Sequence, residues 1–148
     1  MEPFVYTAAP ARIVFGAGSL ADVVQEISRL GLTRALVLST PQQKGDAEAL
    51  SARLGPFAAG VFSNATMHTP VEVTRDAVDA YRAAGADCVV ALGGGSTTGL
   101  GKAVALRTEA PQIVIPTTYA GSEVTPILGQ TENGVKTTIR GPEILPEV

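Results

Sequence analysis

A glycine-rich turn in the second half of the chain has the residue types and spacing of a phosphate-binding site. A short apolar run, 88–92, is followed by Gly93, Gly94 and Gly95, and then by Ser96, where a helix-like segment begins. Glycines let a backbone approach a ligand closely and adopt positive φ. The free N–H groups and the dipole at a helix start attract an anion. We therefore expect this turn to bind the pyrophosphate of a dinucleotide, which indicates hydride transfer.

The same turn also allows a purely structural interpretation. Three consecutive glycines do not reproduce the Gly-x-Gly-x-x-Gly fingerprint, and Lys102 is followed by Ala103 instead of the Ser or Thr of a P-loop. The alternative is a strand-to-helix turn that binds nothing.

Composition indicates one globular domain over residues 1–148. Apolar residues make up 45% of the chain and charged residues 17%, which is typical of a folded domain. The net charge of −3 without a basic cluster argues against nucleic acid and anionic membranes as partners. No apolar run reaches the roughly 18 residues of a membrane span. The single cysteine, Cys88, lies in an apolar run and is expected to be a buried, inert thiol. We expect a cytoplasmic protein.

Segments with the patterns of strands and helices alternate along the chain. Five apolar runs predict strands, at 11–16, 35–39, 57–62, 89–92 and 112–115. Amphipathic spacing predicts helices after the glycine turn and at 19–30, 46–54 and 71–84. Thr74 interrupts the apolar stripe of the last of these. The alternation is typical of an α/β fold, a Rossmann-like doubly wound parallel sheet with right-handed crossovers.

Four polar loops follow predicted strands: 39–41, 64–70, the glycine turn and 116–118. Ligands of doubly wound sheets bind beyond the carboxyl ends of the strands. We therefore expect these loops to meet in one crevice.

Beyond residue 115 the pattern changes. Asn133 and Gly134 separate two strand-like runs, 127–131 and 136–139, which predicts a C-terminal β-hairpin. The last residues, 142–148, form another apolar run, from which we expect a truncation before a further domain and self-association through the face left exposed.

These motifs together resemble the N-terminal, cofactor-binding domain of the iron-containing (group III) alcohol dehydrogenase superfamily. The resemblance covers essentially the whole chain and rests on segments 93–96 with Lys102, 115–118, 121–124 and 145–146. Within that superfamily, three segments are most similar to the maleylacetate reductases: 67–70, 95–102 and 117–123.

The resemblance implies an enzyme that uses NADH or NADPH to reduce the carbon–carbon double bond of maleylacetate, a small dicarboxylate, to 3-oxoadipate. That reaction belongs to the bacterial breakdown of aromatic compounds. It also implies a homodimer and an all-helical second domain that holds the metal ligands, an Asp and several His. Because this chain has a single His, we expect no metal ligands in it.

The resemblance further implies cofactor-binding roles for several residues outside the glycine turn. Thr117 and Thr118 offer hydroxyls near the adenosine or the diphosphate, or else form a turn that bonds to its own backbone. Ser122 touches the cofactor or caps a short helix. Lys136 reaches a ribose hydroxyl or is simply an exposed lysine. Thr40 belongs to the cofactor site through the loop after the 35–39 strand.

Two residues are candidates for catalysis. His68 lies in the predicted crevice, where an imidazole could contact the nicotinamide ribose or a substrate carboxylate; a merely solvated His is the alternative. Tyr119 bonds the dicarboxylate substrate or packs across a domain junction.

The chain departs from the wider superfamily at two positions. Gly99 replaces the usual acidic residue, and residues 39–41 replace the usual Asp after the second predicted strand. An Asp there would repel a 2′-phosphate, so its loss predicts weak discrimination between NADH and NADPH. The sequence also allows two other interpretations: the cofactor domain of a metal-dependent alcohol dehydrogenase of this superfamily, and a non-catalytic nucleotide-binding module.

Overall fold

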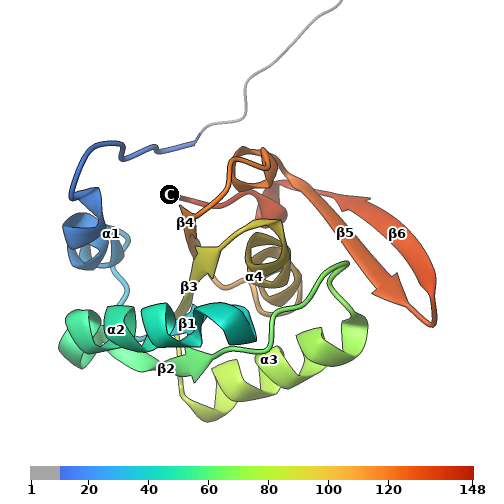
Figure 1. The fold of residues 1–148 in the computed structure, drawn as a ribbon, viewed down its shortest axis with the longest axis horizontal. Helices are drawn as coiled ribbons and strands as arrows, with labels where there is room; N and C mark the ends of the chain where they lie inside the picture. Colours follow the sequence, from blue (N-terminus) through green and yellow to red (C-terminus); the bar gives the residue numbers. More distant parts are fainter. Residues whose placement is uncertain (1–10) are drawn as a thin grey trace, which may run out of the picture.

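A four-stranded parallel sheet forms the centre of the computed structural model, which describes residues 11–148. Its strands are β1 (Ala35–Leu38), β2 (Ala58–Phe62), β3 (Cys88–Gly93) and β4 (Gln112–Pro116), in the order β2-β1-β3-β4 (Figure 1). The chain moves from β1 outward to β2 and then crosses back to β3 on the other side of β1. Loops that leave β1 and β3 therefore diverge between these two strands, which is where doubly wound sheets bind ligands.

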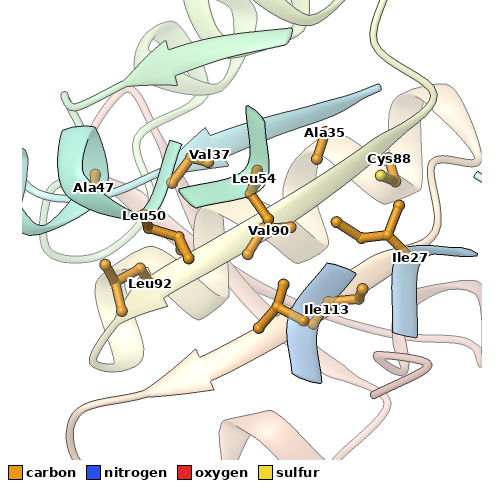
Figure 2. Close-up of a cluster of buried hydrophobic side chains, with 11 residues drawn as sticks. Ile27, Ala35, Val37, Ala47, Leu50, Leu54, Cys88, Val90, Leu92 and Ile113 are labelled. Atoms are coloured by element: carbon orange, nitrogen blue, oxygen red, sulfur yellow. The ribbon is translucent and has the colours of Figure 1, made fainter. Parts of the chain in front are cut away.

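Helices cover both faces of the sheet, as the alternating pattern predicts. α1 (Val23–Arg29) and α2 (Lys44–Leu54) pack on one face, where they form a core with alternate side chains of β1 and β3 (Figure 2). α3 (Val71–Ala83) and α4 (Gly95–Thr108) pack on the other face, against the remaining side chains of these strands. Both central strands are buried on both faces, which explains why each is a continuous apolar run.

Thr74 sits on the buried face of α3 and is fully enclosed. Its hydroxyl donates to the carbonyl of Pro70 at 3.1 Å, one turn earlier in the chain. Because the polar group is satisfied locally, the interruption of the apolar stripe does not prevent the helix. The helix predicted at 71–84 is confirmed.

The strand predicted at 11–16 is wrong. Residues 11–15 have no regular secondary structure, and Ile13 and Phe15 are 71% and 86% exposed. The edge of β4 is instead paired with the last residues of the chain, since the N–H of Val114 donates to the carbonyl of Val148 at 2.8 Å. The sheet therefore has four strands, and the helix predicted from Ser19 begins as a 3-10 turn at Ser19–Asp22.

The predicted C-terminal hairpin is confirmed. β5 (Ile127–Glu132) and β6 (Val135–Arg140) form an antiparallel pair, and the φ angles of 50° at Asn133 and 75° at Gly134 are those of a type I′ turn. The hairpin lies beside α4 (Figure 1), and a small core of Ala103, Leu128 and Ile144 joins the two. No helix in residues 11–148 is long and apolar enough to cross a membrane.

Candidate functional site

The loops that follow β1, β3 and β4 meet at the carboxyl edge of the sheet, as predicted. The N–H of Thr117 donates to the carbonyl of Gly93 at 2.9 Å, and Nε2 of Gln43 donates to the hydroxyl of Thr117 at 3.3 Å. A Cβ at Gly93, which has a φ of 155°, would collide with Oγ1 of Thr97. A Cβ at Gly94 would lie 2.8 Å from Oγ1 of Thr118. The first two glycines of the turn are therefore needed for this close packing of loops.

The third glycine opens onto a cleft of about 300 Å³. A Cβ at Gly95 would meet only the Cβ of Ala120, at 3.7 Å, so the space in front of it is free. The cleft lies between the first turns of α4, the loop before α3 and the hairpin. Its lining residues are Met67, His68, Thr69, Gly95, Ser96, Gly99, Ser122, Ile127, Leu128, Gly129 and Lys136.

The charges around the cleft favour an anion. None of its described lining residues carries a carboxylate, whereas Lys136 and His68 are present. α4 begins at Gly95 without a side-chain cap. The N–H groups of Thr97 and Thr98 donate to the carbonyl of Gly94, each at 3.1 Å, so the N–H groups of Gly95 and Ser96 are the ones that lack a partner within the helix. These donors and the positive end of the helix dipole form an anion-binding site.

His68 owes its position to a strained loop. His68 and Thr69 have φ angles of 67° and 45°, in the left-handed region that non-glycine residues rarely occupy. Thr69 is buried and its carbonyl accepts from the N–H of Thr131 at 3.2 Å. A Cβ at Gly99 would lie 2.5 Å from Oγ1 of Thr69. The missing side chain at position 99 therefore makes room for the loop that brings His68 to the cleft.

The cleft gathers only part of the predicted site. Gly95, Ser96, Ser122, Lys136 and His68 line it. Gly93 and Gly94 lie next to it in the turn, where they support the start of α4.

Besides Gly93 and Gly94, four predicted site residues lie outside the lining of this cleft. Thr40 follows β1 and precedes the 3-10 turn Pro41–Gln43, and Thr117 and Thr118 contact Gln43 and the glycine turn. Tyr119 is 84% exposed and lines a second cavity, of about 440 Å³, together with residues 11–16, α1 and β4. The structure therefore does not bring Tyr119 and His68 into one cavity.

Lys102 donates to Ser122 and Ile127 of the cleft lining, and it is missing from the site residues that sequence reasoning selected. It is fully buried, and its Nζ donates to the carbonyls of Thr125 at 2.7 Å and Ile127 at 2.9 Å and to the hydroxyl of Ser122 at 3.1 Å. Burial lowers the pKa of Lys102 to about 8, partly offset by the carboxylate of Glu123. One signal could have identified it: small and apolar neighbours on all sides of its helix.

Within residues 11–148 no three His, Cys, Asp or Glu side chains lie close enough together to hold a metal ion. The side chains described therefore do not fit an iron site. The lone cysteine, Cys88, is buried in β3, as predicted.

Comparisons with known proteins agree with this geometry. The sequence pattern of the family described as "Iron-containing alcohol dehydrogenase" matches residues 10–148. The chain is 85% identical over its whole length to a maleylacetate reductase of Rhizobium sp. (strain MTP-10005), and 57% identical over 99% of its length to one of Burkholderia cepacia. The crystal structure of maleylacetate reductase from Agrobacterium tumefaciens superposes on 99% of the chain with a TM-score of 0.95 and 85% identity.

The chain spans 42% of the length of each of these three relatives. The matched region contains the parallel sheet, the glycine turn and the hairpin that surround the cleft. On this evidence the chain belongs to the iron-containing alcohol dehydrogenase family.

Proposed function

We propose that this chain is the NADH- or NADPH-binding part of a maleylacetate reductase. The observation that carries the proposal is the cleft at the start of α4, which joins free helix N–H groups to Lys136 and His68 and has no carboxylate among its described lining residues. The 85% identity to the Rhizobium enzyme supports the choice of reaction. Because the chain spans 42% of that relative, the complete reaction is proposed for the whole protein.

In this proposal the diphosphate binds to the N–H groups of Gly94, Gly95 and Ser96. Lys136 and Ser122 line the opposite side of the cleft and offer polar groups to a ribose. The bound nicotinamide would supply a hydride to the alkene carbon beta to the ketone of maleylacetate. His68 stands where it can contact the nicotinamide ribose or a carboxylate of this dianionic substrate.

The place of the enzyme in the cell is part of the same proposal. Reduction of maleylacetate to 3-oxoadipate places the protein in the breakdown of aromatic compounds, in the cytoplasm. Without an Asp in the 39–41 loop, we expect NADH and NADPH to bind with similar affinity.

We also propose that the protein is a homodimer. Exposed apolar side chains surround the second cavity, among them Ile13, Phe15, Leu20, Tyr119 and Val124. A patch of this kind is typical of an interaction surface. Sedimentation at increasing concentration should show self-association that Phe15→Ser weakens and that Val135→Ser, on the exposed side of β6, leaves unchanged. If the unmodified chain is a monomer at all concentrations, the proposed homodimer is contradicted.

The test of cofactor binding is a fluorescence titration with NADH and NADPH. The chain has no Trp, so the emission of the reduced nicotinamide is measured against little background. Gly95→Val should keep the fold, because a Cβ there meets no close contact, yet its branched side chain would fill the cleft. We expect about tenfold weaker binding or more, which corresponds to a clash of about 1.4 kcal/mol.

Gly45→Val is the matched control, since position 45 is an exposed site at the start of α2 with open space around it. Equal affinity of the Gly95→Val variant and the unmodified chain would contradict the proposed site. Maleylacetate-dependent oxidation of NADH is then measured in a fusion of this chain to the region that follows in the Rhizobium relative.

A further inference from the structure

Lys102 is a buried cation held only by neutral oxygens. Its side chain is 0% exposed, and lysines are rarely buried in this way unless they are paired. An ammonium group has three protons. Nζ has three acceptors within 3.1 Å, the carbonyls of Thr125 and Ile127 and the hydroxyl of Ser122, and a fourth, the hydroxyl of Thr125, at 3.4 Å. No ion pair of Lys102 is found among the described residues.

The three acceptors belong to the side of the cleft that faces α4. Ser122 and Ile127 both line the cleft, and Thr125 lies between them in the chain. Lys102 follows Gly99 by three residues and Gly95 by seven, so the three share one face of α4. Gly95 and Gly99 line the cleft from that helix. The lysine therefore connects one wall of the cleft to the other.

We propose that Lys102 is a positioning residue of the cofactor cleft, whose ammonium group fastens the start of β5 to α4 and supplies a buried positive charge that favours a diphosphate anion. This inference rests on the proposed function and deepens it. The role is distinct from that of Lys136, an exposed residue of β6 that lines the cleft itself.

The protonation state of Lys102 provides a measurable test of this arrangement. A neutral amine has two N–H groups and one lone pair, so deprotonation of Lys102 either removes one of these hydrogen bonds or reverses the one with the hydroxyl of Ser122, which can donate to Nζ. Burial places the pKa of Lys102 at about 8. An anion in the cleft favours the charged form, so binding above that pH must take up a proton. The affinity for the cofactor therefore falls as the pH rises through about 8.

Other charged groups surround this part of α4. Glu123, in the 3-10 turn Ser122–Val124, raises the pKa of Lys102 and so opposes the effect of burial. His68 and Lys136 line the same cleft, and Glu143 lies in the 3-10 turn Pro142–Ile144 that packs on α4. The pH dependence of cofactor affinity is therefore attributed to Lys102 only where the unmodified chain differs from a variant that lacks this amine.

The first experiment compares NADH binding by the unmodified chain, Lys102→Met and Lys44→Met at about pH 7, 8 and 9. Met fills a similar volume without the charge, and Lys44 is an exposed lysine of α2 that serves as the matched control. We expect the affinity of the unmodified chain to fall by up to about tenfold in total as the pH rises above the midpoint, the limit set by one pKa unit of interaction. Lys102→Met should bind about tenfold more weakly at pH 7, equivalent to one pKa unit of interaction, and show a flatter profile. Lys44→Met should match the unmodified chain.

A second experiment needs no cofactor and no variant. In an NMR titration of the ligand-free chain, the Cε resonance of Lys102 and the amide resonances of Ile127 and Leu128 should change with a common midpoint near the pKa of about 8. Amides of β5 that do not respond to the titration of Lys102 would overturn the inference. So would a folded Lys102→Met variant that binds NADH with the affinity and pH profile of the unmodified chain.

The two experiments separate the two proposals. If the unmodified chain fails to bind NADH and NADPH, the proposed function is contradicted. The NMR titration still decides whether Lys102 fastens the start of β5 to α4.

Discussion

Gly99 lies close to Thr69, where α4 meets the loop that carries His68. A Cβ at position 99 would lie 2.5 Å from Oγ1 of the buried Thr69, so Ala at this position forces one of the two segments to move. Overpacking of this kind costs about 1–3 kcal/mol. Replacing Gly with Ala also stabilises a helix by about 1 kcal/mol. The free energy of unfolding of Gly99→Ala is therefore compared with that of another Gly→Ala variant in a helix.

We predict that Gly99→Ala has a lower free energy of unfolding than Gly45→Ala, by about 1–3 kcal/mol, in urea titrations. Position 45 has open space around it and serves as the control. The double variant Thr69→Ala with Gly99→Ala should recover most of the difference, because it removes the hydroxyl that the new methyl group meets. Equal stability of the Gly99→Ala and Gly45→Ala variants would contradict this account of the loop.

The residue types predict part of the site, and the rest depends on contacts between distant segments of the chain. The glycine turn and Ser96 are evident from the sequence because a helix start after a buried strand needs only local information. His68 and Thr69 have left-handed φ angles, and Thr69 contacts β5 and lies close to α4, which are far away in the chain. Lys102 has a charged side chain, and its burial depends on carbonyls more than twenty residues later.

At the level of elements, the four strands of the sheet are predicted from the sequence and the segment 11–16 is predicted wrongly. β1, β2, β3 and β4 are apolar runs flanked by turns, and each prediction is confirmed to within a residue or two. The segment 11–16 has an equally apolar pattern, yet the edge of β4 is taken by the last residues of the chain. Local pattern cannot show which of two candidate segments pairs with a given edge.

The hairpin provides a prediction at this scale. Gly134 has a φ of 75° in the turn between β5 and β6, and a side chain there costs about 1–2 kcal/mol. Gly134→Ala should therefore open the hairpin more often. In hydrogen-exchange measurements, we expect amides of β5 and β6 to exchange about fivefold faster or more, for a loss of about 1 kcal/mol.

The amides of β1 and β3 should keep their exchange rates in the same variant, because these strands pack in separate clusters from the hairpin. Acceleration across the whole sheet would mean that the hairpin and the sheet unfold as one unit. Unchanged exchange in β5 and β6 would mean that the turn does not limit the hairpin.

For the whole molecule, an ion-pair cluster links the irregular 11–16 segment to α1. Arg12 donates twice to Glu26, at 2.7 and 2.8 Å, and Arg29 donates to the same carboxylate at 2.7 Å. The bonds from Arg12 lower the pKa of Glu26 to about 2, against the opposing effect of burial and with further help from Arg29.

This shift predicts how stability depends on acid. A carboxylate with a lowered pKa stabilises the fold above its ordinary value of 4.5, and this contribution is lost as the pH falls toward about 2. We expect Glu26→Gln to be less stable than the unmodified chain at neutral pH, with the difference shrinking across that window. Urea unfolding at several pH values is the measurement.

Glu48→Gln is the control for this series, because Glu48 pairs only with Lys44 on the exposed side of α2, at 3.7 Å. Exposed pairs contribute little to stability, so this variant should follow the unmodified chain at every pH. An acid dependence that Glu26→Gln leaves unaltered would show that other carboxylates dominate.

The single buried thiol gives the protein a built-in reporter. Cys88 is fully enclosed in β3, and burial, with Asp87 adding to it, raises the pKa of the thiol to about 12. Because the thiolate is the reactive form, a thiol reagent can label this chain only when the central sheet opens. The labelling rate then measures that opening in every variant without any added probe. A molecule that binds only the closed form slows the labelling in proportion to its occupancy, so a ligand with no colour or fluorescence can be ranked on the same scale as NADH.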